Sequence, residues 1–264
     1  MDISIVIVNY KSLEKTRKCL AAIYAANLNG LSFETIVVDN ASGDNLDEFK
    51  IHYPNLQVLY SSQNLGMGGG NNLALKQAQG DFVLILNPDT IVSNSAIRIL
   101  FDYIKSHDDV FVVGPKLLNP DDTLQYSCSR FPKVYTPILR RTFLGDYFKT
   151  SRDGFMMTDF NHDEIREVDW LMGSCLLVRQ AGWDGFDERF FMYFEDIDLG
   201  RRVKAIGKKV IYNPRAVVVH DHQRQSARWP WYVAPFKDSL AREHIKSWLK
   251  YFWKWKVRIF NNKK

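Results

Sequence analysis

The run Ile3-Ser4-Ile5-Val6-Ile7-Val8 stands near the start of the chain and is almost entirely apolar and β-branched. A continuous run of this kind is typical of a strand that is buried on both faces of a parallel sheet. Helical spacing follows in Leu13–Ala26, and a second apolar run follows in Phe33–Val38. Strands separated by helices need right-handed crossover connections. The sequence therefore predicts an α/β fold with a mainly parallel sheet flanked by helices.

The same alternation continues through the first half of the chain. It predicts further strands at Leu56–Tyr60, Phe82–Leu86 and Val110–Val113. It predicts further helices at Leu46–Tyr53, Asn71–Gln79 and Ser93–His107. After Pro115 the rhythm breaks, and residues 119–166 predict a strand or hairpin near Leu124–Cys128 and then a long variable loop. Regular structure is predicted again after this loop. An apolar segment at Val168–Val178 is followed by a helix at Asp196–Ile206. Two short strands at Lys209–Tyr212 and Ala216–Val219 and a long terminal helix at Phe236–Phe260 complete the chain. We expect one domain over residues 1–235 and a helical extension over residues 236–264.

The composition is that of an ordinary globular protein. The 264 residues are 46% hydrophobic and 25% charged, which is enough to bury a sizeable core. The three cysteines match no disulfide or metal-binding spacing, as in a protein of the reducing cytosol. The first residues carry no basic segment, so we expect no signal peptide, and no apolar run approaches the ~18 residues of a membrane-spanning helix. These features predict a cytoplasmic protein.

The net charge of +5 is concentrated at the C-terminus. Residues 237–264 contain nine Lys or Arg and two Asp or Glu, a charge of +7, which leaves −2 on residues 1–236. The basic pI therefore belongs to a tail on a slightly acidic body. A tail of this kind is no evidence of a nucleic-acid-binding domain, and we expect no nucleic-acid partner.

Four successive predicted strands end in polar residues. The segments are Asn9-Tyr10, Asp39-Asn40, Ser61–Asn64 and Asn87-Pro88-Asp89. Ligands of open parallel sheets collect beyond the carboxyl ends of the strands, so these side chains are expected to share one site. Asp39 could accept a hydrogen bond from a base or a ribose hydroxyl, although an acid in this position also serves as a turn former or helix cap.

A glycine-rich segment, Gly66-Met67-Gly68-Gly69-Gly70, precedes the helix predicted at Asn71–Gln79. Glycines let a backbone approach a ligand closely, and the N-terminus of a helix favours phosphate. The segment follows the third strand, and Asn71 takes the place of the third glycine of a dinucleotide fingerprint, which argues against a dehydrogenase. The chain also lacks the G-K-[ST] of a P-loop here, and a purely structural glycine turn stays an alternative.

Acids and a histidine complete the candidate site. Asp89 follows an apolar strand in a turn stiffened by Pro88 and could bind Mg²⁺ or Mn²⁺ on a pyrophosphate, or simply cap the next helix. The aromatic run Phe190–Phe194 precedes Glu195-Asp196-Ile197-Asp198, and aromatic walls would raise a carboxyl pKa and favour a general base. Acids in a first helical turn also complement the helix dipole. His220 ends a strand and could bind a metal, although a lone histidine is more often structural.

Taken together, these segments resemble the inverting glycosyltransferase family 2, whose members have the Rossmann-like GT-A fold. The resemblance runs in order through roughly residues 3–222, and it is carried by Ile5–Tyr10, Val37–Ser42, Asn64–Asn71, Leu86–Asp89, Gly173–Cys175, Phe194–Leu199 and Pro214–His220. Each segment is weakly specific, but their order and spacing are highly specific. The nearest-looking subgroup is rhamnosyltransferase-like, with Asn-Pro-Asp where other members have Asp-x-Asp.

The resemblance implies a role for each matching position. Asp39 would contact the nucleotide base, and the remaining nucleotide-sugar contacts would come from Asn9, Asn64, Gly66, Asn71 and Asn87. Asp89 matches the metal-binding acid, with His220 completing the site for Mg²⁺ or Mn²⁺; Asn87 replaces the other acid, so one charge fewer faces the metal. Asp196 matches the catalytic base, assisted by Glu195. Orientation of the acceptor or base would fall to Asp198, Gly173 and Ser174.

The function that the resemblance implies is transfer of a sugar from a nucleotide diphosphate to a hydroxyl of a glycan or lipid-linked glycan, in bacterial cell-surface polysaccharide synthesis. The subgroup favours dTDP-L-rhamnose, and galactofuranose or another hexose stays open as the donor sugar. Two alternatives compete: a nucleotidyltransferase, which would need a Gly- and Lys/Arg-rich loop unlike Asn9-Tyr10-Lys11-Ser12, and a non-catalytic nucleotide-sugar-binding protein of the same fold.

The C-terminal extension combines aromatic and basic residues at helical spacing. Apolar side chains from Phe236 to Ile259 recur on one face, and Lys246, Lys250, Lys254 and Arg258 recur every four residues on another. Such a helix could lie at the inner face of the cytoplasmic membrane and favour anionic lipid. The alternative is a helix packed against the body or a partner chain.

Overall fold

The computed structural model describes residues 1–136, 147–221 and 233–256. The strands are β1 (Ile3–Asn9), β2 (Phe33–Asp39), β3 (Leu56–Tyr60), β4 (Phe82–Leu86), β5 (Thr90–Val92), β6 (Val110–Leu118), β7 (Leu124–Gln125), β8 (Cys128–Ser129), β9 (Arg166–Val168), β10 (Trp170–Leu171), β11 (Cys175–Arg179) and β12 (Lys209–His220). The helices are α1 (Leu13–Ala25), α2 (Asp47–His52), α3 (Gly66–Leu75), α4 (Ala96–Lys105), α7 (Lys149–Met156), α8 (Glu195–Ala205), α9 (Ala234–Lys237) and α10 (Ser239–Lys254).

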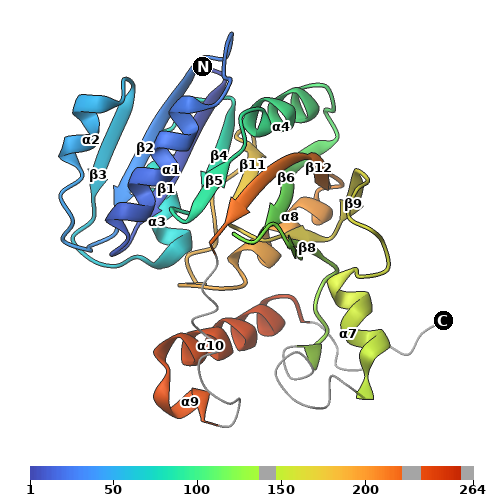
Figure 1. Cartoon of the computed structure of the whole chain (residues 1–264). Coiled ribbons are helices and arrows are strands. Elements are labelled where there is room, and N and C mark those ends of the chain that lie inside the picture. Colours follow the sequence, from blue (N-terminus) through green and yellow to red (C-terminus); the bar gives the residue numbers. More distant parts are fainter. Residues whose placement is uncertain (137–146, 222–232, 257–264) are drawn as a thin grey trace.

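One large mixed sheet organises the chain, with strand order β3-β2-β1-β4-β11-β6-β12-β5, β7 beside β6 and β9 beside β12 (Figure 1). Strands β3, β2, β1 and β4 run parallel, which confirms the prediction for the first half of the chain. β11 is inserted antiparallel between β4 and β6. The α/β fold with flanking helices is thus the predicted one, and its second half adds antiparallel pairs that the helix–strand alternation does not reveal.

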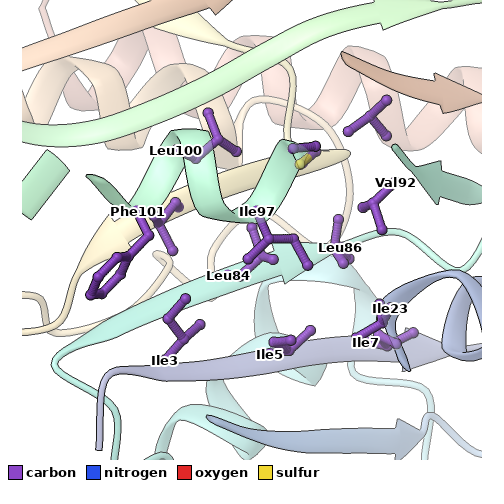
Figure 2. Packing of buried hydrophobic residues seen from close by; sticks show 14 of the residues in the cluster. Ile3, Ile5, Ile7, Ile23, Leu84, Leu86, Val92, Ile97, Leu100 and Phe101 are labelled. Carbon is purple, nitrogen blue, oxygen red and sulfur yellow. The ribbon is translucent and has the colours of Figure 1, made fainter. Parts of the chain in front are cut away.

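Both faces of the sheet are buried, as the apolar run at residues 3–8 predicts. On one face Ile3, Ile5 and Ile7 pack with residues of α1 and α4 (Figure 2). On the other face Val6 and its neighbours pack with residues of α3 and α8. Two covered faces leave the strand ends as the place where polar side chains can gather.

Helix α3 differs from the sequence prediction of a glycine turn followed by a helix at Asn71–Gln79. The helix begins at Gly66 and ends at Leu75, so the glycines form its first turns. A Cβ on Gly70 would lie 2.8 Å from a methyl group of Val8, and one on Gly69 would lie 2.9 Å from Leu65 Cβ. Gly70 therefore serves close packing of α3 on β1, and Gly69 makes room for Leu65 at the start of the helix, at the cost of some helix propensity.

The second half departs from prediction in its strand boundaries. The two short strands predicted at Lys209–Tyr212 and Ala216–Val219 are one strand, β12, whose register with β6 shifts between Asn213 and Val217. The strand or hairpin predicted near Leu124–Cys128 corresponds to two short strands, of which β7 pairs with β6 and β8 pairs with β10. The variable loop predicted over residues 119–166 contains α7.

The predicted single C-terminal helix is two helices, α9 and α10. Asp238 is extended between them and accepts a hydrogen bond from Leu240 N at 2.8 Å, an N-cap that starts α10. Figure 1 shows both helices below the sheet, and residues 257–264 of the predicted extension lie outside the described part of the chain. None of the described helices is long and apolar enough to cross a membrane.

Candidate active site

Asn9 and Asp39 form a buried polar hub where β1 and β2 end side by side. The two residues are register partners, and Asn9 Nδ2 donates to Asp39 Oδ1 at 3.0 Å. Asn9 Oδ1 accepts from Ser12 and Thr16, both at 2.9 Å. Asp39 also accepts from the hydroxyl and the backbone N–H of Ser42. The hub holds the Asp39 carboxylate in one orientation at the edge of the sheet.

Asn40 holds the loop that leads into α3. Its side chain is buried and donates to Asn64 Oδ1 and to the carbonyl of Gly66, both at 3.0 Å. Its Oδ1 accepts from Leu65 N at 2.8 Å. The predicted residues Asn64 and Gly66 are therefore brought to the same edge as Asp39 by a residue that directly follows it in the sequence.

The N-terminus of α3 is joined to the aromatic segment before α8. Met67 N donates to the carbonyl of Phe191 at 2.9 Å, and a Cβ on Gly66, whose φ is +74°, would overlap that carbonyl. Asn71 is buried and donates to Met67 O at 2.9 Å, and its Oδ1 has no hydrogen-bond partner among the described residues. A buried amide oxygen without a protein partner is costly unless a ligand or water supplies a donor.

Asp89 and His220 meet because β5 pairs antiparallel with β12. Asp221 N donates to the Asp89 carbonyl at 2.9 Å, and His220 Nε2 lies 3.3 Å from Asp89 Oδ1. Lys15, from α1, lies 3.8 Å from Asp89 Oδ2 and 3.1 Å from Asp221 Oδ2. Burial opposes ionisation of Asp89, but the contact with His220 and the nearby charges outweigh it, so its pKa lies below the ordinary value.

The Asp89–His220 pair fits two ligands of one divalent cation. Two ligand atoms at ~2.1 Å from an ion and at right angles would be roughly 3.0 Å apart, close to the separation in this pair. Within residues 1–136, 147–221 and 233–256, no group of three or more His, Cys, Asp or Glu side chains could hold a metal. A two-residue site suits Mg²⁺ or Mn²⁺, whose other ligands are waters and substrate oxygens.

The antiparallel pairing of β11 with β4 links Asn87 to the acids of α8. Asn87 N donates to Ser174 O at 2.9 Å, and Gly173 N donates to Asp196 Oδ2 at 3.1 Å. A Cβ on Gly173 would lie 2.8 Å from the Met67 methyl group and 3.5 Å from Asp196 Cβ. Gly173 therefore sits at the junction of the α3 and α8 N-termini, where a larger residue would require the Met67 methyl group to move.

Glu195 and Asp196 differ in their surroundings. Glu195 is 2% exposed and its Oε2 has no hydrogen-bond partner among the described residues, whereas Asp196 keeps part of its surface exposed. Burial, and then the charge of Asp196, raises the pKa of Glu195 well above its ordinary value. Burial also raises the pKa of Asp196, to about 6, against the backbone N–H groups of Gly173 and Ile197. Ionisation is therefore opposed at Glu195, and Asp196 is the accessible carboxyl of the pair.

The turn before α8 is strained. Tyr193 and Phe194 have φ values of 67° and 70°, which non-glycine residues rarely adopt, at a cost of about 1–3 kcal/mol each. Packing offsets this cost: Phe194 lies in an aromatic cluster with Phe190 and Tyr251, and Ser247 Oγ donates to Met192 O at 2.8 Å. The turn sets the direction in which Glu195 and Asp196 enter the helix.

Asp198 faces α10. It is 0% exposed, and its carboxylate accepts from Lys254 Nζ, Trp255 Nε1 at 2.8 Å and Arg202 Nε at 3.1 Å. Lys254 also pairs with Asp187 at 2.7 Å. With its lone pairs engaged in this way, Asp198 anchors α10 to α8. Its role in orienting the acceptor or the base stays a prediction.

A hollow lies elsewhere. It has a volume of about 420 Å³ and is lined at the amino ends of the strands by Ser32, Glu34, Gln57 and Gln79. The opposite end of the strands holds the strained turn before α8, the two carboxyl groups of raised pKa, and the Asp89–His220 pair. We therefore place the chemistry at the carboxyl ends, which is also where sheets of this type bind ligands.

The structure brings the predicted residues together in two linked groups. Asn9, Asp39, Asn64, Gly66 and Asn71 cluster around β1, β2 and α3, and Asp89 and His220 lie between β5 and β12. Hydrogen bonds of Asn87, Ser174 and Gly173 lead from the second group to Asp196. Sequence reasoning missed Lys15 and Gln125, which contact Asp89 and His220 from distant segments. No local pattern marks either residue.

The chain is similar to known proteins over most of its length. Residues 4–165 match glycosyl transferase family 2. An N-acetylglucosaminyl-diphospho-decaprenol L-rhamnosyltransferase of Mycobacterium tuberculosis is 29% identical over 245 residues, which cover 86% of this chain and 78% of the relative. The rhamnosyltransferase WbbL of Escherichia coli is 28% identical over 262 residues, which cover 92% of this chain and 94% of the relative.

A solved structure supports the fold. The crystal structure of GalNAc-T7 with UDP, GalNAc and Mn²⁺ aligns with a TM-score of 0.66 at 13% identity. The alignment covers 95% of this chain, and this chain spans 47% of that protein. At this identity the likeness concerns the fold alone, which is that of GT-A glycosyltransferases.

The raised pKa of Asp196 predicts a measurable titration. In ¹³C-labelled protein, we expect the Asp196 carboxyl signal to titrate with a midpoint near 6, and Asp196→Asn to remove that signal. Between the ordinary carboxyl pKa of about 4 and this midpoint, the folded state binds more protons than the unfolded chain, so this group lowers stability as pH rises through the window. A midpoint at or below 4 would contradict the assigned environment.

Proposed function

Because the chain belongs to glycosyl transferase family 2, we propose that this glycosyltransferase moves L-rhamnose from dTDP-L-rhamnose to a hydroxyl of a glycan or lipid-linked glycan. Two rhamnosyltransferases that align with most of this chain support the choice of sugar. The acceptor class follows the first of these relatives, whose name includes a diphospho-decaprenol carrier. The reaction would serve bacterial cell-surface polysaccharide synthesis.

One observation carries the catalytic proposal: Asp196 is a partly exposed acid of raised pKa, held by Gly173 beside the strand end that contains Asn87 and Asp89. A base whose pKa lies near the working pH is efficient in both taking up and releasing a proton. Burial opposes ionisation of Glu195 next to it, which disfavours a second negative charge that would repel the diphosphate donor.

The reaction is a single displacement. The Asp196 carboxylate removes the proton of the acceptor hydroxyl as its oxygen forms a bond to the anomeric carbon of the sugar. The bond from that carbon to the diphosphate oxygen breaks, and the nucleoside diphosphate leaves with the electron pair. Attack opposite the leaving group inverts the anomeric centre, and the held geometry of the two substrates supplies much of the rate enhancement.

The nucleotide end of the donor is assigned to the hub at β1 and β2. Asp39 would accept from the base, and Asn9 would act mainly by orienting Asp39, since its own side chain is engaged within the hub. Asn64 and Gly66 would border the same pocket. The Asn71 amide oxygen would accept a sugar hydroxyl, which would satisfy a buried polar atom.

A divalent cation is proposed at Asp89 and His220, where it would offset the charge that develops on the leaving diphosphate. The 3.3 Å separation of the two ligand atoms supports this assignment. Lys15, 3.8 Å from Asp89 Oδ2, would add a second positive charge that faces the diphosphate.

Two alternatives remain distinguishable from this proposal. A galactofuranosyl or other hexosyl donor would use the same base and cation site and would differ only in the sugar contacts. A non-catalytic nucleotide-sugar-binding protein would bind the donor without transfer. The raised pKa of Asp196 favours catalysis, because ligand binding alone gains nothing from a buried base.

Peripheral contact with the inner face of the cytoplasmic membrane is proposed for the outer surface of α9 and α10. Phe236, Leu249 and Trp253 are 84%, 57% and 79% exposed there, although the opposite side of α10 packs on the body. Basic residues of the same helices would favour anionic lipid. A lipid-linked acceptor would then lie at the surface on which the enzyme sits.

Transfer tests the function. With dTDP-L-rhamnose, Mn²⁺ and a polyprenyl-diphosphate N-acetylglucosamine acceptor, we expect Asp196→Asn to lower the turnover number by roughly 10²–10⁴-fold, the usual contribution of a general base. The Kd for the donor should stay close to that of the wild type, and exposed Asp108→Asn should behave like the wild type. Wild-type turnover should rise with pH through about 6, because the base must be ionised. Normal turnover in Asp196→Asn would contradict the assignment.

Cation binding is tested by thermal stability. At a Mn²⁺ concentration about 100 times its Kd, we expect wild-type protein to gain about 2.7 kcal/mol. Asp89→Ala should lose this gain, whereas Asp108→Ala, whose side chain is 99% exposed, should keep it. An unchanged Mn²⁺ response in Asp89→Ala would remove this residue from the site.

Membrane contact is tested by co-sedimentation with vesicles that contain anionic phospholipid. The triple variant Phe236→Ser, Leu249→Ser and Trp253→Ser should bind less than the wild type, because it removes the exposed apolar surface and leaves the packed side of α10 intact. Ile51→Ser, which removes an 81% exposed side chain on α2, is the matched control. Equal sedimentation of the triple variant and the control would refute the contact.

A further inference from the structure

A chain of directed hydrogen bonds ends on His220. It runs through the turn between β6 and β7, and its members are Asp121, Thr123, Asn119 and Gln125. His220 Nδ1 lies 2.6 Å from Gln125 Oε1, on the side of the ring away from Asp89. None of these four residues has a role in the reaction proposed for Asp196.

The direction of every bond follows from the first. The Asp121 carboxylate accepts from the Thr123 hydroxyl at 2.5 Å and from its backbone N–H at 3.1 Å, and these bonds lower its pKa, so it is an acceptor only at neutral pH. Since the Thr123 hydroxyl donates its proton to Asp121, its oxygen accepts from Asn119 Nδ2 at 2.8 Å. Asn119 therefore presents Oδ1 to the next member.

The same logic fixes Gln125. Its Nε2 donates to Asn119 Oδ1 at 2.8 Å and lies 3.4 Å from the His220 carbonyl, so the amide nitrogen faces two acceptors. Its Oε1 is thus left to face His220 Nδ1 and can only accept. In the neutral imidazole one ring nitrogen carries the proton and the other carries a lone pair.

We propose that this relay, with Gln125 as its last member, fixes the proton of neutral His220 on Nδ1 and so presents the Nε2 lone pair to the cation position beside Asp89. The proposal rests on the cation site of the proposed function. Gln125 is then a positioning residue, since it acts only through His220. Imidazole ligands of metals are commonly held by such an outer hydrogen bond.

Two carboxylates compete for the direction of the relay. Asp121 favours the direction described, and Asp89 would attract a proton to Nε2 if the whole chain reversed. Reversal would remove the short hydrogen bond from Thr123 to Asp121. It would also require the side-chain amides of Asn119 and Gln125 to rotate, so that each exchanges its donor and acceptor positions. The 2.6 Å contact at Nδ1 against 3.3 Å at Nε2 favours the Asp121 direction, and a cation on Asp89 would reinforce it.

The tautomer can be read directly by ¹⁵N NMR of histidine-labelled, metal-free protein at about pH 8.5, above the ordinary histidine pKa. The chain has six histidines, and His220→Gln identifies the signals of His220. We expect a protonated Nδ1 and an unprotonated Nε2 in the wild type. Gln125→Leu should give a mixture or the reverse pattern, and Gln125→Glu, which keeps an acceptor, should retain the wild-type pattern.

Mn²⁺ binding by calorimetry supplies the second measurement. Gln125→Leu should weaken Mn²⁺ binding by about tenfold or more, the usual effect of losing an outer-shell partner, and Gln125→Glu should not. Gln77→Leu, at an exposed glutamine outside the relay, is the matched control. An Nε2-protonated wild type, or an unchanged tautomer and Mn²⁺ affinity in Gln125→Leu, would overturn the relay alone. Failure of the wild type to bind Mn²⁺ would instead overturn the cation site, and with it the purpose proposed for Gln125.

Discussion

The insertion of β11 between β4 and β6 is the constraint on which the site depends. Its antiparallel register places Cys175 opposite Leu86, so the residues before β11 lie beside the residues after β4. Ser174 then accepts from Asn87 N, and Gly173 is left with its N–H directed at Asp196. A shift of one residue would exchange the faces of β11 and break both contacts. The end of β4 and the Asp196 carboxylate are thus linked through the backbone of Ser174 and Gly173, which is stiffer than a pair of side chains.

The first half of the site could be predicted from the sequence because its logic is local. Apolar runs locate the parallel strands, and the polar residues at their ends must then share one edge. Asn9 and Asp39 lie side by side for this reason, and the acids after Phe194 are recognisable as a helix start. From the sequence, the glycines at residues 66–70 are predicted to form a turn before the helix. They form the first turns of α3, where the missing side chain of Gly70 allows α3 to approach β1. Local pattern does not distinguish these two uses.

The second half depends on contacts between distant segments. The direction of β11, the continuity of β12 through a register shift, and the contacts of Gln125 and Lys15 arise from pairings over many residues. The C-terminal helix shows the difference clearly. Its aromatic and basic residues recur at helical spacing, and the segment is helical. The spacing does not show which side is covered: Tyr251 is 0% exposed within the body, whereas Trp253 is 79% exposed. The sequence indicates an amphipathic helix, and only the fold decides what covers each side.

The same helix explains how the chain tolerates its own active site. Glu195 is buried with an unpartnered oxygen, and Tyr193 and Phe194 have left-handed backbone conformations, and each of these features costs stability. Left alone, this segment would relax and carry Asp196 away from Gly173. The contacts of α10 act on the flanks of the segment: Ser247 holds Met192, and Lys254 bridges Asp187 and Asp198. Because the ion pairs at Asp198 are buried and hydrogen-bonded, losing one partner would leave an uncompensated charge, and relaxation is opposed on both sides. Helix α10 is therefore part of the framework that holds the start of α8, whatever its outer surface contacts.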